Sequence, residues 1–287
     1  MNKNVVLVAE TGADITPEQA QQYGIYIVPM HVTMGNDTLD DGSFPVTDLY
    51  AYYEKTGKLP KTSAASPEDF TSTFDEIHAR FPEKHILHLA YSAQTTCSYE
   101  NAVVASVGRD YVTSIDTKQV SGGQCAVVIK VAQLLQADPD MSAEQSIEMA
   151  NRVINSVHMC FLPDDLEYLR AGGRVSNVAC MGSRLFHIHP CIEVINGLLT
   201  VTKKLRGSLG KIAPRLIRDF SDTHAFDTEI LYFLWSKGLK EEVRVIAEAA
   251  AKQYGYKKVQ WIETGCVITS HGGPGAFGVV GYSKTGA

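Results

Sequence analysis

Several common features are absent from this chain. Its six cysteines, at positions 97, 125, 160, 180, 191 and 266, include no Cys-x-x-Cys pair, so we expect reduced core cysteines rather than a disulfide framework. No apolar run approaches the roughly 18 residues of a membrane span. The first run ends at Glu10 and is too short for a signal peptide. No Lys/Arg-rich run favours nucleic acid as a partner. Together these absences predict a cytoplasmic protein.

The composition that is present is that of an ordinary globular protein. The 287 residues are 45% hydrophobic and 20% charged, with a net charge of -6. A chain of this length can bury a large core and is expected to form two domains. We place their boundary after a predicted helix, giving an amino-terminal domain over 1–157 and a carboxy-terminal domain over 158–287.

The first half of the sequence alternates predicted strands with predicted helices. Thr16-Pro17 and Ser66-Pro67 are typical helix starts, with a capping hydroxyl before a proline. The expected strands lie at 5–9, 25–34, 85–91 and 111–116, and the expected helices follow them, including 95–107. This alternation predicts an α/β domain with a parallel sheet and helices on its faces.

The second half has a different pattern. Asn196-Gly197 separates two strand-like runs, 188–195 and 198–203, and this dipeptide is the strongest short hairpin signal. Further strands are expected near 229–235 and 259–262, with a helix between them. These features predict a second α/β domain with a mixed sheet.

The segment from Ser270 to Gly278 places His271 in front of four glycines and a proline. Glycine lets the backbone approach another group closely, and histidine adds a titratable hydrogen-bonding side chain. Gly273-x-Gly275-x-x-Gly278 also matches the dinucleotide fingerprint. That fingerprint requires a following helix and a later acidic residue, whereas the residues after Gly278 favour a strand, so we do not predict nucleotide binding.

Hydroxyl side chains provide further candidates. Ser92 follows the strand at 85–91, and ligands of parallel sheets bind beyond the carboxyl ends of the strands. Thr62 and Ser63 lie in a predicted loop, while Ser66 is better explained as a helix cap. Ser92 alone could equally be a capping serine. Paired with His271 it could be the nucleophile of an ester hydrolase, although no Gly-x-Ser-x-Gly elbow is present.

Two arginine-containing segments could bind phosphate or carboxylate. Arg170 and Arg174 flank paired glycines, and Arg206 ends a basic strand; arginine beside glycine suits anion recognition. The alternative is ordinary surface charge beside helix-capping glycines. His187, His189 and Cys191 have metal-capable side chains, but a structural zinc site needs four ligands, so no metal is predicted.

These motifs, in this order, resemble the DegV family of fatty-acid-binding proteins along essentially the whole chain. The matching segments are Ala13-Asp14-Ile15, Tyr23–Pro29, Asp41-Gly42, Thr62-Ser63, Ser92, Ile115–Lys118, Gln124, Tyr168–Ser176, Arg206-Gly207 and His271–Gly275. The resemblance implies two α/β domains with an acyl chain buried between them. It also implies a non-catalytic protein without a cofactor, which presents a long-chain fatty acid to the catalytic subunit of a bacterial fatty acid kinase.

By the same resemblance, the fatty-acid carboxylate would contact Thr62, Ser63, Ser92, His271 and Gly272. Arg170 and Arg206 would face the kinase and the phosphoryl group. No nucleic acid and no membrane-spanning segment are expected, and contact with a membrane surface would be transient.

The chain departs from the family pattern around the proposed head-group site. Glu10-Thr11 replaces the usual Asp-Ser, Ser92-Ala93 replaces two consecutive serines, and His189-Pro190 stands where Lys-Pro is common. Gln94–Cys97 also differs from the usual Leu-Ser-Gly. These changes leave open a ligand other than a fatty acid, such as another amphiphilic carboxylate.

Overall fold

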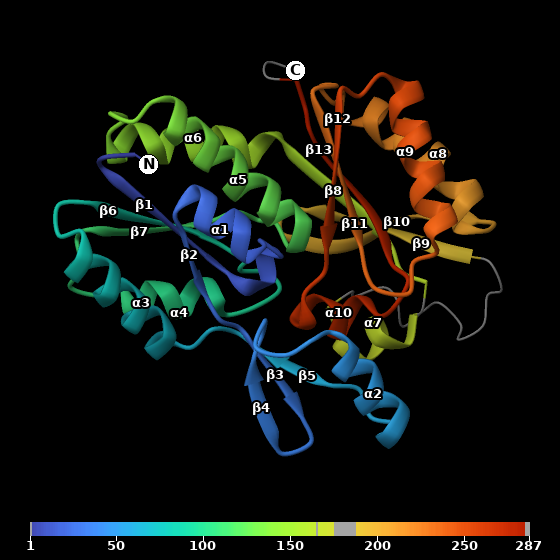
Figure 1. Ribbon diagram of the computed structural model, residues 1–287, viewed down its shortest axis with the longest axis horizontal. Coiled ribbons are helices and arrows are strands. Elements are labelled where there is room, and N and C mark those ends of the chain that lie inside the picture. The colour runs from blue at the N-terminus through green and yellow to red at the C-terminus, as the bar shows by residue number, and fades with distance from the viewer. Residues whose placement is uncertain (1, 165, 175–187, 285–287) are drawn as a thin grey trace. The chain divides into compact units, whose positions relative to one another are not determined.

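The structure is a computed structural model that describes residues 2–164, 166–174 and 188–284 (Figure 1). The chain divides into two compact units. The N-terminal unit comprises Met1–Asn155 and Gly265–Val267, and the C-terminal unit comprises Ser156–Thr264 and Ile268–Ala287. Each unit is described by itself below.

The N-terminal unit contains a four-stranded parallel sheet in the order β2-β1-β6-β7. Its strands are β2 (Ile25–Val28), β1 (Val5–Glu10), β6 (His85–Ala90) and β7 (Val112–Asp116). Helices α1 (Pro17–Tyr23) and α5 (Ser121–Ala137) contact each other, and so do α3 (Pro67–Arg80) and α4 (Ser98–Ala105). The two pairs lie on opposite faces of the sheet (Figure 1). The predicted parallel α/β fold is confirmed.

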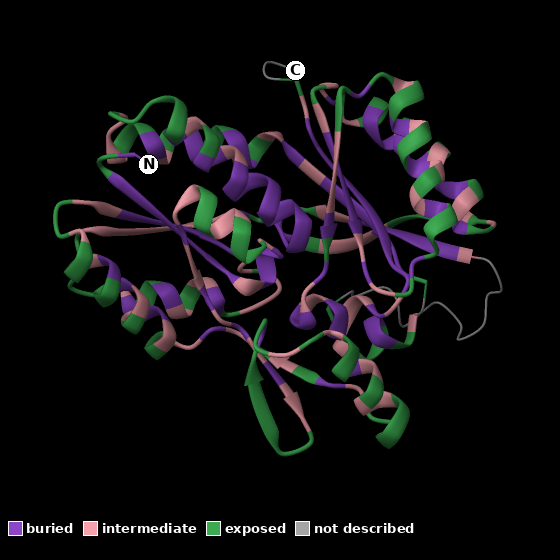
Figure 2. Cartoon of the chain, viewed as in Figure 1, coloured by how far each residue is buried: buried purple, intermediate pink, exposed green. Residues whose placement is uncertain are grey.

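Apolar side chains on both faces of the sheet explain this packing. Every residue of β1 is buried, as Figure 2 shows for the strand as a whole. A cluster of apolar side chains from α3, β1 and β6 forms one core, including Phe70, Phe74, Val8 and Ile86. A strand covered on both faces needs apolar residues in succession rather than in alternation, which is the pattern of β1.

Both predicted helix starts are confirmed. Thr16 and Ser66 each accept a hydrogen bond from the backbone N–H three residues later, and the side chains of Gln19 and Asp69 each accept one from the N–H of the cap residue. Such capping boxes satisfy donors that a helix end otherwise leaves unpaired.

The predicted strand at 25–34 is wrong, because it is two strands in different sheets. β2 ends at Val28 and β3 (His31–Met34) begins after Pro29, which has no N–H for a strand ladder. Residues 37–40 form β4 (Asp37–Asp40), and Thr62 and Ser63 lie on β5 (Lys61–Ser63) rather than in the predicted loop. These strands form a small antiparallel sheet, β4-β3-β5, next to α2 (Thr47–Thr56) in sequence.

The C-terminal unit contains a six-stranded mixed sheet in the order β10-β9-β8-β13-β11-β12. The strands are β8 (Val157–Leu162), β9 (Ile188–Ile195), β10 (Leu198–Arg206), β11 (Ile230–Trp235), β12 (Lys258–Glu263) and β13 (Phe277–Tyr282). Only β11 and β12 pair in parallel among these described strands. The predicted mixed sheet is confirmed. So is the hairpin, since Asn196 and Gly197 both have positive φ, 51° and 84°, as a tight hairpin turn requires.

Two long helices complete this unit. α8 (Leu209–Thr223) and α9 (Glu241–Tyr254) pack together and share a core with the sheet, in which Phe220, Phe233 and Phe277 are buried. The fingerprint-like glycines lead into β13, as the sequence predicts, and not into the helix that the dinucleotide fingerprint requires. The remaining helices are the short α7 (Leu166–Gly172) and α10 (Cys266–Gly272), and α6 (Ala143–Ser156) in the N-terminal unit.

Candidate functional site

Ser92 lies in the loop that follows β6, at the carboxyl end of the parallel sheet. The residue is fully buried, and its N–H donates to Gln119 O at 2.9 Å. Its Oγ accepts a hydrogen bond from Gln94 N–H at 3.3 Å. Its carbonyl accepts from both the N–H and the hydroxyl of Thr95. This turn explains why α4 begins at Ser98 and not at the predicted residue 95.

A buried polar cluster lies beneath this loop. Both carboxylate oxygens of Glu10 accept from Tyr91 N–H, at 3.2 and 3.1 Å, and Oε2 accepts from Gln124 Nε2 at 2.7 Å. His88 Nε2 lies 3.3 Å from Glu10 Oε1. Glu10, His88 and Gln124 have no exposed surface. Glu10 therefore fixes the backbone at Tyr91, the residue before Ser92.

The charge of Glu10 is stabilised despite its burial. Burial alone would raise the pKa of this carboxyl group, but His88, Gln124 and the Tyr91 N–H together lower the pKa below its ordinary value. Neither Glu10 nor His88 is among the site residues that the sequence predicts. A carboxylate at the end of an otherwise apolar, doubly covered strand was the available signal.

A second pair of acids holds the segment that joins β12 to α10. Asp14 accepts from Gly265 N–H at 2.7 Å, and Asp41 accepts from Cys266 N–H at 2.9 Å. Burial raises the pKa of both carboxyl groups, that of Asp14 well above its ordinary value. The hydroxyl of Ser121, a residue with positive φ, donates a hydrogen bond to Asp14. Both backbone hydrogen bonds lie within the N-terminal unit, to which Gly265–Val267 belongs.

Thr62 and Ser63 are placed by the small sheet. Thr62 pairs with Val32 and Ser63 with His31 across β3 and β5. Thr62 is half-buried and Ser63 is exposed. Thr62, Ser63 and Ser92 thus belong to the N-terminal unit, whereas His271, Gly272, Arg170 and Arg206 belong to the C-terminal unit.

His271 lies at the end of α10 and packs against α7. A Cβ on Gly172 would overlap its imidazole ring. Conversely, a Cβ on Gly273 would lie 2.8 Å from the ring of Tyr168. Gly172 therefore leaves space for the ring of His271, and Gly273 leaves space for the ring of Tyr168. Neither segment, 168–174 or 271–275, shows this relation alone.

The imidazole of His271 is neutral at physiological pH. Burial, followed by the positive charge of Arg174, lowers its pKa to about 4. Arg174 itself donates from Nη1 to Gly172 O at 2.6 Å. A neutral imidazole has one nitrogen that donates and one that accepts a hydrogen bond, so His271 can bind a polar head group without adding charge.

The predicted anion-binding arginines are both on the surface. Arg170 is exposed in the last turn of α7, and Arg206 is exposed at the end of β10. The end of the predicted 168–176 segment lies outside the described residues, as does His187. His189 Nδ1 lies 3.1 Å from Pro163 O, and no cluster of three metal-capable side chains occurs within residues 2–164, 166–174 and 188–284.

The comparisons with known proteins identify the family. The sequence matches the family described as "Uncharacterised protein, DegV family" over residues 4–284. The chain belongs to the DegV family. A DegV domain-containing protein from Caldanaerobacter subterraneus is 25% identical over 280 residues, which cover 96% of this chain and 98% of that protein.

Solved DegV structures share the fold. A fatty-acid-binding DegV family protein from Thermus thermophilus superposes with a TM-score of 0.87 at 24% identity, covering 98% of this chain and all of that one. A stearic-acid-binding protein from Eubacterium ventriosum gives a TM-score of 0.84 at 22% identity, covering 99% of both chains. In the described part of this DegV chain, no helix combines the length and apolar character needed to cross a membrane.

The close packing of Gly172 and His271 predicts a specific substitution effect. Gly172→Ala should lower the free energy of unfolding of the C-terminal unit by about 1–3 kcal/mol, the usual cost of overpacking. Gly272→Ala is the matched control, because a Cβ there meets nothing within 4 Å. Urea unfolding monitored by tryptophan fluorescence suits the measurement, since Trp235 and Trp261 both lie in this unit. Equal stabilities of the two variants would contradict the packing.

Proposed function

We propose that this DegV protein binds a long-chain fatty acid in a buried apolar tunnel and presents its carboxylate to a separate fatty acid kinase. The observation that carries the proposal is the match to the family along the whole chain. Relatives with the same fold are described as fatty-acid-binding. The chain itself supports the proposal with a fixed, buried Ser92 and a neutral His271.

The head group would be held by hydrogen bonds rather than by an ion pair. We assign this role to Thr62, Ser63, Ser92, His271 and Gly272. Hydroxyl groups and a neutral imidazole can each donate to a carboxylate oxygen. A buried carboxylate without such donors would cost several kcal/mol. With these donors the carboxylate has its hydrogen bonds and remains able to accept the phosphoryl group.

Affinity would come mainly from the acyl chain. A chain of about 16 carbons buries about 14 methylene groups at about 0.8 kcal/mol each, or roughly 11 kcal/mol before the costs of association and ordering. Polar contacts at one end then select for an acid without having to supply the binding energy.

The protein would have no catalytic activity and no cofactor of its own, because the phosphoryl donor belongs to the kinase. We place it in the cytoplasm, where ATP is available. Its described cysteines, Cys97, Cys125, Cys160, Cys191 and Cys266, are all free thiols, in keeping with a reducing compartment. Its contact with membranes would be transient, at the lipid surface.

Mass spectrometry of extracted ligand tests the proposal directly. Denaturing the purified protein and extracting it with organic solvent should release about one fatty acid per chain, with a defined range of chain lengths. A lipid-free extract, together with no uptake of added palmitate, would contradict the proposal. Ester turnover by the isolated protein with labelling of Ser92 by a phosphonate probe would instead indicate a hydrolase.

Arg170 and Arg206 are expected to act only in phosphoryl transfer. Because both are exposed, Arg170→Gln and Arg206→Gln should leave palmitate affinity unchanged and lower turnover with the cognate kinase by about 10-fold or more, as loss of a charge-assisted contact predicts. Lys55→Gln, on the exposed surface of α2, is the matched control. Unchanged turnover in both arginine variants would remove them from the transfer role.

A further inference from the structure

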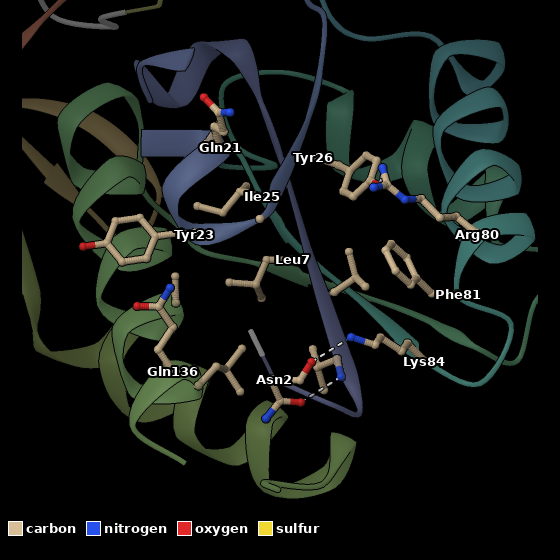
Figure 3. Close-up of a pocket in the computed structure, with 16 residues that line it drawn as sticks. Asn2, Leu7, Gln21, Tyr23, Ile25, Tyr26, Arg80, Phe81, Lys84 and Gln136 are labelled. Atoms are coloured by element: carbon tan, nitrogen blue, oxygen red, sulfur yellow. Dashed lines mark hydrogen bonds between the residues drawn. The ribbon is translucent and has the colours of Figure 1, made fainter. Parts of the chain in front are cut away.

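A cavity lies at the open edge of the parallel sheet, beside the amino-terminal end of β1, whereas the loop that carries Ser92 follows the carboxyl end of β6. β2 pairs only with the second part of β1, from Leu7 to Glu10. The first residues of β1, Val5 and Val6, therefore face a gap where a longer edge strand would continue. The gap contains a cavity of about 270 Å³ (Figure 3).

The floor of this cavity is apolar and belongs to rigid elements. Leu7 from β1 and Ile25 from β2 contribute to it, with Ala132 and Leu135 from α5. All four are buried. Figure 3 shows Leu7 and Ile25 between the helices that bound the two sides. Such a floor can bury the apolar body of a ligand.

The charged residues at the cavity are all positive. Arg80 and Lys84 line it, and no acidic side chain does, although the chain as a whole has a net charge of -6. The two cations approach the same ring, with Arg80 Cζ 5.2 Å and Lys84 Nζ 5.1 Å from the centre of Phe81. Neither forms an ion pair with any residue in the described ranges; Arg80 donates to Tyr26 Oη at 3.2 Å and Lys84 to Asn2 O at 2.8 Å.

Aromatic rings in its lining give the cavity a preference for an aromatic ligand. Tyr23, Tyr26 and Phe81 all line it, and Figure 3 shows Tyr26 and Phe81 beside the two cations. Aromatic pairs add attraction beyond the area that they bury. The volume lies just below the range of about 300–1,000 Å³ typical for drug-sized ligands, so the ligand must be small.

We propose that this cavity is a second ligand site, which binds a small aromatic carboxylate. The ring of the ligand lies at the open edge of β1, between the floor and Phe81, and its carboxylate faces Arg80 and Lys84. The site is distinct from the proposed fatty-acid site because it lies wholly within the N-terminal unit and none of Thr62, Ser92 or His271 lines it.

The proposal is tested with 2-naphthoate, a fluorescent bicyclic carboxylate, on the full-length protein saturated with palmitate. Saturable binding of one equivalent is expected, with amide shifts in ¹H–¹⁵N spectra concentrated near Leu7, Ile25 and Lys84. The neutral analogue 2-naphthamide should bind more weakly. Binding to the palmitate-free protein but not to the palmitate-saturated protein would instead mean that the probe occupies the fatty-acid site and would overturn the proposal.

Two variants separate charge from shape. Arg80→Gln combined with Lys84→Gln should weaken binding of 2-naphthoate by about 10-fold, as expected for two charge-assisted contacts at a partly exposed site. Ala132→Leu should abolish binding by filling the cavity, while Lys55→Gln should leave it unchanged. Because Arg80 and Lys84 form no ion pair among described residues, their double variant should fold normally. Unchanged affinity in that variant, or no saturable binding to the wild-type protein, would overturn the proposal.

Discussion

Replacing Glu10 by alanine should destabilise the N-terminal unit more than any other single change considered for this protein. Glu10 and His88 are fully buried and lie 3.3 Å apart. Alanine would leave a cavity beside the buried ring of His88, and each buried polar donor left without an acceptor usually costs about 1–3 kcal/mol. Here Tyr91 N–H and Gln124 Nε2 would also lose their acceptor. Urea unfolding followed by far-UV circular dichroism measures the effect.

Two controls separate the charge of Glu10 from its size. Glu10→Gln retains the volume and one acceptor oxygen, so it should destabilise the unit less than Glu10→Ala. Glu76→Ala, at an exposed position of α3, should change stability by about 0.5 kcal/mol or less. If Glu10→Ala were no more destabilising than Glu76→Ala, the buried cluster would not support the loop that carries Ser92.

Replacing His271 by glutamine should have the largest effect on ligand binding. If His271 donates a hydrogen bond to the buried carboxylate, its loss should weaken palmitate binding by about 10- to 100-fold, since hydrogen bonds to charged groups contribute about 1.5–3 kcal/mol. His78→Gln is the matched control, because His78 stacks on Tyr111 in the N-terminal unit. Affinity equal to that of the wild type, in a folded His271→Gln protein, would remove His271 from the head-group site.

The low pKa of His271 also predicts a direction for pH dependence. The native pKa is about 4 and that of the unfolded chain is about 6.5. Between these values the unfolded state binds the proton and the native state does not, so stability should fall as the pH decreases from about 6.5 to about 4. His158, with a native pKa of about 4, contributes in the same direction. His271→Gln should therefore reduce the slope without abolishing it, and an unchanged slope would contradict the assignment.

Local sequence signals predicted much of the fold. The hydroxyl–proline pairs at 16–17 and 66–67, and Asn196-Gly197, encode their turns within a few residues, and the structure confirms each. Pro29 is also a local signal for a break, but the predicted strand at 25–34 runs through it. The small sheet β4-β3-β5 was missed because β4 is exposed and mostly polar, although it follows β3 directly, and because β5 pairs with β3 from a distant segment.

The candidate site was harder to read because its geometry depends on residues far apart in sequence. Nothing local to Gly172 indicates that it accommodates His271, and nothing local to Glu10 indicates that it will meet His88 across two strands. The resemblance to the DegV family supplied candidate residues, whereas the supporting contacts could be found only in the folded chain.

The N-terminal unit is not a contiguous piece of chain, since Gly265–Val267 belongs to it. A fragment ending at Asn155 would lack the backbone N–H groups that Asp14 and Asp41 accept from. Two buried carboxyl groups would then each have lost a backbone donor, although Ser121 would still donate to Asp14. Dissecting the protein at its apparent domain boundary would thus yield an incomplete first half, and fragment complementation would require a second piece that includes Gly265–Val267.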